Sequence, residues 1–115
     1  KGGRNMLIVA VAFEFVPGGF KRIREEIIDA IENTRKEDGV QIYDWAIDVT
    51  APNRGTIFKQ WDYQWDDDHD FTQLYMDTVV AALGAANIRG DIKSYSADIY
   101  DVSDKRNMDI VLPTE

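Results

Sequence analysis

The sequence predicts a single α+β domain in which helices cover one face of an antiparallel sheet. Three observations predict this class. Segments with strand-like alternation and segments with helical spacing follow one another in the order β-α-β-β-α-β, glycine and proline turns separate several of them, and no repeat or linker interrupts them. This order is the split β-α-β, ferredoxin-like plan. With 115 residues, 44% of them hydrophobic, the chain has the size and the apolar content of one ordinary domain.

The first strand and the first helix have the clearest patterns. Residues 6–16 are β-branched and aromatic, and they stop at the turn signal Pro17-Gly18-Gly19. The spacing then predicts a helix over residues 20–38, with Gly39 placed for a left-handed C-terminal cap. One stripe of this helix carries its apolar residues and one threonine: Phe20, Ile23, Ile27, Ile28, Ile31 and Thr34.

The remaining elements complete the plan. We expect a strand over residues 40–50, a hairpin loop over 51–55 and a third strand over 56–63. Helical spacing returns from residue 71 to Gly84, and a last strand covers residues 91–102. The domain therefore spans residues 6–103. Residues 1–5 are interpreted as an N-terminal extension or an expression remnant, and residues 104–115 as a C-terminal tail.

The first strand is apolar on both of its faces. One face carries Leu7, Val9, Val11, Phe13 and Phe15, and the other carries Met6, Ile8, Ala10 and Ala12. Two helices on one side of a sheet leave the other side open, and exposed apolar area costs about 25 cal/mol per Å². A second copy of the chain is the simplest cover. The pattern thus predicts a homodimer whose sheets pack face to face.

Charge and composition narrow the classes of partner. Twenty-one acidic and thirteen basic residues give a net charge of −8, which disfavours nucleic acid and anionic membranes as partners. The longest apolar run, residues 6–13, is too short to span a bilayer. The chain contains no cysteine, which fits a cytoplasmic location and excludes disulfides and thiolate chemistry.

Residues 61–71, WDYQWDDDHDF, place four acids around the only histidine. Asp66, His69 and Asp70 have the i, i+3, i+4 spacing that can bring metal ligands together on a helix. Acids in a first helical turn also favour the positive end of the helix dipole, and an unbroken helix would put His69 on the polar face. A solvated helix start is the favoured interpretation. A pocket role for His69 and a metal site stay open.

Trp61 and Lys59 share a face of the third strand, and both have a structural and a functional interpretation. Trp61 is either a core residue or a platform for a ligand. A buried Lys59 needs a partner, which Asp44 or Asp48 on the neighbouring strand could supply. Lys59 would then form a structural ion pair or supply a pocket charge with a shifted pKa.

With these elements in order, the chain resembles the antibiotic biosynthesis monooxygenase family of dimeric α+β barrels over residues 6–103. The resemblance rests on the apolar first strand running into Pro17-Gly18 and on the helix ending in residues 34–39. It also rests on Val40-Gln41-Ile42-Tyr43 before an Asp-rich strand, and on a third strand ending in Trp61.

The chain departs from the family at its site positions. Where many members have Glu-x-Trp, this chain has Lys59-Gln60-Trp61. His69 follows Trp61 by eight residues instead of nine. The Asn, Trp and His residues of the haem-degrading branch have no counterpart here, which disfavours haem degradation.

The resemblance implies an oxygenase that acts without cofactor or metal on a small aromatic or quinol-like molecule. Trp61, Tyr75 and Trp45 would bind the ring, while His69 or Lys59 would assist deprotonation or hold the anion. Two alternatives stay open: a non-catalytic ligand-binding or structural dimer, and an isomerase or cyclase on the same fold.

Overall fold

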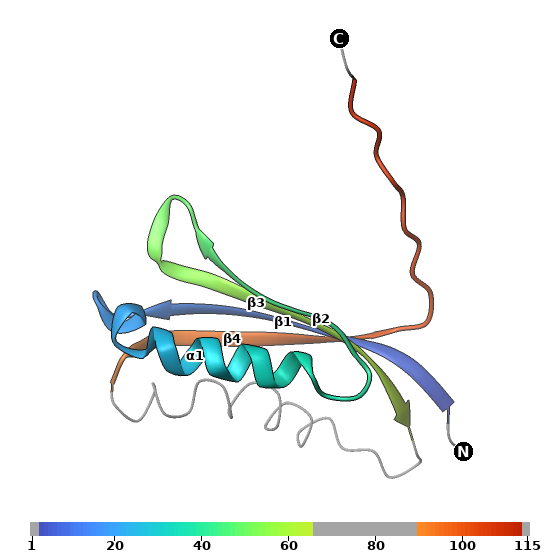
Figure 1. Cartoon of the computed structure of the whole chain (residues 1–115), viewed down its shortest axis with the longest axis horizontal. Helices are drawn as coiled ribbons and strands as arrows, with labels where there is room; N and C mark the ends of the chain where they lie inside the picture. Colours follow the sequence, from blue (N-terminus) through green and yellow to red (C-terminus); the bar gives the residue numbers. More distant parts are fainter. Residues whose placement is uncertain (1–2, 66–89, 114–115) are drawn as a thin grey trace.

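The computed structural model describes residues 3–65 and 90–113. Four antiparallel strands and one helix make up this part: β1 (Gly3–Phe15), α1 (Gly19–Arg35), β2 (Val40–Asp48), β3 (Ala51–Trp65) and β4 (Ile92–Val102) (Figure 1). The sheet order is β2-β3-β1-β4. This order confirms the ferredoxin-like α+β prediction. The helix expected over residues 71–84 lies outside the described residues.

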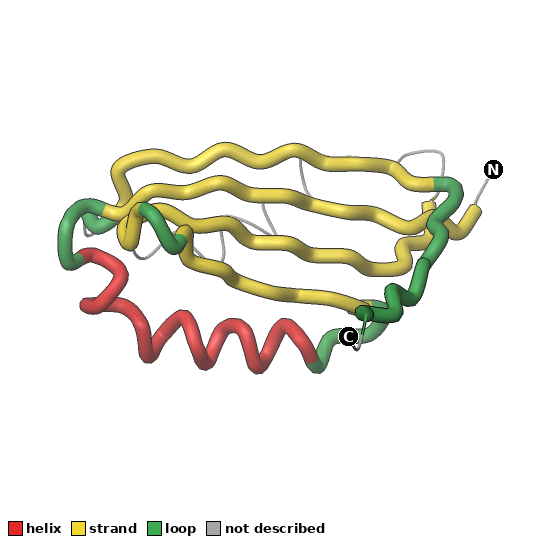
Figure 2. Tube along the Cα trace, turned by 90° about the horizontal axis from the view of Figure 1, so that it is seen from above, coloured by secondary structure: helices red, strands yellow, loops and turns green. Residues whose placement is uncertain are grey.

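The core lies between the sheet and α1, which packs along one face of the sheet (Figure 2). Alternate residues of β1 point toward the helix, and each is at most 3% exposed: Leu7, Val9, Val11, Phe13 and Phe15. Ile23 and Ile27 of α1 meet them. Strand alternation and helical spacing therefore put the predicted apolar stripes in contact.

The start of α1 is tied to the start of β4 around Asp91. Arg22 donates to the buried Asp91 carboxylate through Nε at 2.9 Å and lies 2.7 Å from it through Nη2. The Asp91 carbonyl accepts from Val16 N–H at 2.8 Å. A Cβ at Gly19 would lie 2.6 Å from that same carbonyl, so only glycine permits this close approach.

Several predicted boundaries were wrong by a few residues. β1 begins at Gly3, so residues 3–5 belong to the sheet and pair with residues 63–65. Helix α1 ends at Arg35, before the predicted end at residue 38. Gly39 has the expected positive φ of 83°, but it lies in the turn into β2, where its backbone approaches Asp62.

The predicted hairpin loop over residues 51–55 is part of β3. The turn is shorter because the Asp48 carboxylate accepts from both Thr50 N–H, at 2.8 Å, and the Thr50 hydroxyl, at 2.7 Å. These two hydrogen bonds hold the pKa of Asp48 below its ordinary value. Such a side chain-to-backbone turn closes the chain before Pro52 and lets β3 continue alongside β1.

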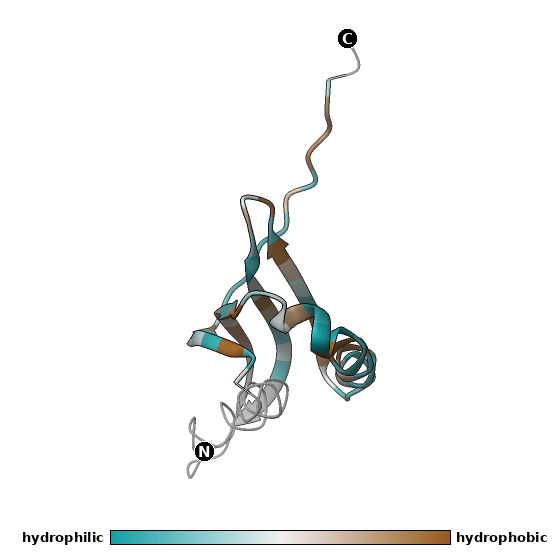
Figure 3. Ribbon diagram, turned by 90° about the vertical axis from the view of Figure 1, so that its left-hand side faces the viewer, coloured by the Kyte–Doolittle hydropathy of each residue, from teal (hydrophilic) through white to brown (hydrophobic). Residues whose placement is uncertain are grey.

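The face of the sheet turned away from α1 carries no helix among the described residues (Figure 3). This open face contains Met6, Ile8, Ala10 and Ala12 of β1, as the sequence predicted, and Phe58 of β3, which is 38% exposed. Within the described residues, no helix is both long and apolar enough to cross a membrane.

Candidate functional site

Lys59 lies in the middle of the helix-facing side of the sheet. In the strand register it stands between Val9 of β1 and Tyr43 of β2, and Trp61 is the next residue on the same face. Only 7% of Lys59 is exposed. The alternation of β3 therefore buries an ammonium group among apolar and aromatic side chains.

The Lys59 ammonium contacts an aromatic face and a carboxylate. Nζ lies 4.6 Å from the Trp61 ring centroid and 5.9 Å from that of Tyr43, distances typical of cation–π attraction. Glu37, in the connection between α1 and β2, places Oε1 3.7 Å from Nζ. Glu37 is well exposed, so a buried cation here meets a carboxylate that reaches solvent.

Tyr43 is the polar aromatic next to Lys59. Burial raises the pKa of its phenol above 10.0, and the nearby Glu37 charge adds to the shift. Trp45, Thr34 and Arg35 oppose it in part. Tyr43 therefore presents a neutral hydroxyl beside a cation over the whole ordinary pH range.

Trp45 places a buried N–H donor close to the Tyr43 phenol. Its ring packs on Phe13 with centroids 5.3 Å apart. Its Nε1–H is buried and meets no acceptor with full hydrogen-bond geometry among the described residues, but a loose hydrogen bond to the Tyr43 phenol lowers the pKa of that phenol in part. A buried donor whose only acceptor is loosely placed is uncommon in folded proteins and can turn to a ligand oxygen.

The partner expected for Lys59 was wrong. Asp44 and Asp48 point to the opposite face of β2, because successive strand residues alternate between faces. Asp44 is held instead by Arg35, whose Nη2 lies 3.1 Å from Oδ1 while its Nε donates to the Tyr43 carbonyl at 2.8 Å. The carboxylate that contacts the Lys59 ammonium is that of Glu37.

Three of the five predicted site residues share this helix-facing cluster: Lys59, Trp61 and Trp45. His69 and Tyr75 lie outside the described residues. Sequence reasoning missed Glu37 because it follows the helix in a connection without periodicity. The hairpin register could have placed Tyr43 opposite Lys59, since the two residues pair directly.

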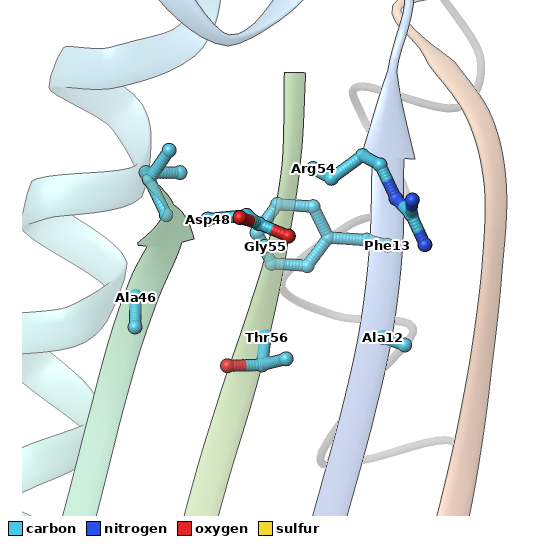
Figure 4. Close-up of a pocket in the computed structure, with 8 residues that line it drawn as sticks. Ala12, Phe13, Ala46, Asp48, Arg54, Gly55 and Thr56 are labelled. Carbon is cyan, nitrogen blue, oxygen red and sulfur yellow. The ribbon is translucent and has the colours of Figure 1, made fainter. Parts of the chain in front are cut away.

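The described residues of the open face line three adjoining hollows of about 270, 340 and 170 Å³, all of which include Ala12. The first hollow lies near the turn that joins β2 to β3, where Arg54 and Asp48 flank Gly55 (Figure 4). A row of small residues crosses the sheet beneath the hollows, each member directly opposite the next in the register: Ala46, Thr56, Ala12 and Ser96.

The hollows lie open on the surface of the sheet, whereas the helix-facing cluster holds a buried cation, a phenol and a buried indole N–H. We therefore place the candidate chemistry at Lys59. Among the described residues, no group of three or more His, Cys, Asp or Glu side chains is arranged to hold a metal ion.

Comparisons with known proteins give the fold a wider context. No family model matches the chain, and no curated protein matches it. Solved structures do. One is a protein from Deinococcus radiodurans, assigned provisionally as an antibiotic biosynthesis monooxygenase, with a TM-score of 0.65 and 15% identity over 89% of this chain and 97% of its own.

A Nitrosomonas europaea protein with the same provisional assignment has a TM-score of 0.62 and 13% identity, over 85% of this chain and 90% of its own. A conserved protein from Methanosarcina mazei has a TM-score of 0.61 and 18% identity, over 84% and 91%. At such identities the likeness shows a shared fold, which is the fold that the sequence resemblance implied.

Proposed function

We propose that this chain binds a small aromatic, quinol-like anion beside Lys59 and directs its oxidation by O2 without a cofactor. The observation that carries the proposal is the buried Lys59 ammonium above the Trp61 ring. A fixed cation in a dry site stabilises an anion far more than water-exposed charge does. The buried Trp45 N–H and the neutral Tyr43 hydroxyl supply further donors.

The reaction proposed for a methylene flanked by aromatic rings is balanced with O2 alone. Loss of one proton gives the stabilised carbanion or enolate, which transfers electrons to O2 and forms a C–O bond. The resulting peroxide loses water as the O–O bond breaks. One oxygen atom becomes the new carbonyl, and the other leaves as water with the two hydrogens of the former methylene. Lys59 would hold the anion, and Trp61 would orient the ring.

Oxygen uptake with a panel of anthrones and quinols tests this proposal. We expect uptake by the wild type and a loss of tenfold or more in kcat/KM in Lys59→Met, because the anion loses its counter-charge. Trp61→Ala should raise KM. Lys93→Met provides the matched control, since Lys93 is an exposed lysine paired with Glu14 at 3.5 Å.

No uptake with any compound, or equal uptake by the wild type and Trp61→Ala, would contradict the oxygenase proposal. An isomerase or cyclase on this fold would turn substrate over under argon, so the same panel is run without oxygen.

The tight burial of the cluster favours a second candidate, a non-catalytic ligand-binding or structural dimer. Lys59, Trp61 and Tyr43 are each at most 7% exposed, which fits a sealed interior as well as a closed pocket. Binding of a hydroxylated aromatic without turnover, measured by quenching of tryptophan fluorescence, would support this candidate. Lys59→Met should weaken such binding.

We also propose that the chain is a homodimer whose open faces pack together, and that it works in the cytoplasm. The partly apolar open face supports the dimer. Phe58 lies beside the row of small residues, so a large protruding side chain and a hollow are on the same face. A two-fold interface needs such self-complementarity, because the Phe58 side chain of each copy would then fit into a hollow of the other copy.

A further inference from the structure

Glu37 connects the buried part of the helix-facing cluster with solvent. Its Oε1 lies 3.7 Å from Lys59 Nζ, and the Glu37 side chain is 60% exposed, whereas that of Lys59 is almost fully buried. Its charge also acts on the Tyr43 phenol, whose pKa it helps to raise. One carboxylate therefore contacts the buried cation and reaches solvent at the same time.

Hydrogen bonds fix the backbone of Glu37 at this place. Its N–H donates to the Thr34 carbonyl at 3.1 Å, and its own carbonyl accepts from Val40 N–H at 3.3 Å. The connection from α1 to β2 is also bound to β3, because Asp62 N–H donates to the Gly39 carbonyl at 3.0 Å. A group that acts at a fixed point needs such a supported segment.

We infer that Glu37 accepts the proton that the substrate loses, as the general base of the reaction proposed above, on which this inference rests. The Lys59 ammonium and the indole N–H of Trp61 only donate. The Tyr43 phenol keeps its proton over the ordinary pH range. Among these described side chains, the Glu37 carboxylate is thus the group that accepts a proton.

Charge balance supports this assignment. The resting pair of Lys59 and Glu37 carries one positive and one negative charge. When the substrate methylene gives a proton to Glu37, the electron pair of the C–H bond stays on the substrate and the carboxylate becomes a neutral acid. The new anion then replaces the carboxylate as the partner of the ammonium, so the step leaves no unpaired charge in a buried site. The acid returns the proton to the peroxide oxygen that forms from O2.

Deuterium exchange under argon tests proton removal apart from oxidation. In D2O, the anthrones of the panel should exchange their methylene protons faster with the wild type than in buffer, because removal is reversible and the exposed Glu37 carboxyl exchanges with solvent. Glu37→Gln should slow this protein-dependent exchange about 100-fold. Glu32→Gln removes the same charge from an exposed position on α1 and should match the wild type. Proton NMR of the methylene signal measures the rates.

Two further measurements separate a base from a residue that only supports Lys59. Glu37→Gln should bind a hydroxylated anthraquinone at least as tightly as the wild type, because the base acts on the proton and not on the ring. Formate should raise the exchange rate of Glu37→Ala severalfold, because an exposed position admits a small carboxylate. Weaker binding in step with slower exchange, without rescue by formate, would overturn the assignment.

The outcomes distinguish this inference from the oxygenase proposal. Exchange that depends on Glu37 without any oxygen uptake would overturn the oxygenase and leave the base standing. Oxygen uptake together with equal exchange by Glu37→Gln and the wild type would overturn the base and leave the oxygenase standing. No exchange above the rate in buffer would also overturn the base.

Discussion

Lys59 is the residue on which the functional proposal depends. Burial of its ammonium is costly, because desolvation offsets much of the attraction to the Glu37 carboxylate 3.7 Å away. Its contact with Trp61 recovers part of that cost. The functional proposal gives the ammonium a second role, as the counter-charge of a bound anion.

Tyr43 makes the burial of this cluster measurable. Its phenol has a raised pKa in the folded state, so above about pH 10 the folded chain keeps a proton that the unfolded chain loses. Stability from this group is therefore complete below pH 10 and falls as pH rises through the folded pKa. The slope is at most about 1.4 kcal/mol per pH unit.

Urea unfolding of the wild type and Tyr43→Phe from pH 8 to pH 11 checks this expectation. The difference in free energy of unfolding between the two proteins should change in favour of Tyr43→Phe above pH 10. A difference that stays constant across this range would show that Tyr43 is as solvated as it is in the unfolded chain.

At the scale of elements, Gly55 fixes how β2, β3 and β1 meet. A Cβ there would collide with the Ala46 carbonyl and lie 2.6 Å from Phe13 Cζ. Gly55→Ala should therefore lower the free energy of unfolding by about 1–3 kcal/mol, as overpacking does. Chemical denaturation measures the change.

The background Phe13→Leu separates the two contacts of Gly55→Ala. Leucine has no atom at the ring end, so part of the cost should disappear while the backbone collision remains. An increase in stability from Gly55→Ala, as reduced chain entropy alone would give, would show that the strands separate easily at this point.

The sequence predicted the elements better than their ends. Alternation correctly placed Lys59 and Trp61 on one face, because period two leaves no choice once β3 is recognised. The hairpin was misjudged because Pro52, Asn53 and Gly55 are turn residues by type, whereas Asp48 and Thr50 close the turn through hydrogen bonds. Glu37 could not be predicted because its contact depends on the path of the chain after α1.

At the scale of the whole molecule, the two faces of the sheet have different roles. The face toward α1 holds the core and the Lys59 cluster. The open face holds Phe58 and the row of small residues, and the exposed C-terminal segment 104–113 leaves the sheet on the same side. A second copy on that face would bury Phe58 and leave both Lys59 clusters on the outer, helix-covered sides of the sheets.

The most direct test of this account is the mass of the chain in solution, measured by light scattering during size-exclusion chromatography at micromolar concentration. We expect twice the chain mass of 13.1 kDa for the wild type and for Asn33→Asp, which adds the same charge on exposed α1, and a shift to 13.1 kDa in Phe58→Asp. A wild type that elutes at 13.1 kDa, or a Phe58→Asp variant that keeps the full dimeric mass, would contradict the packing of two open faces.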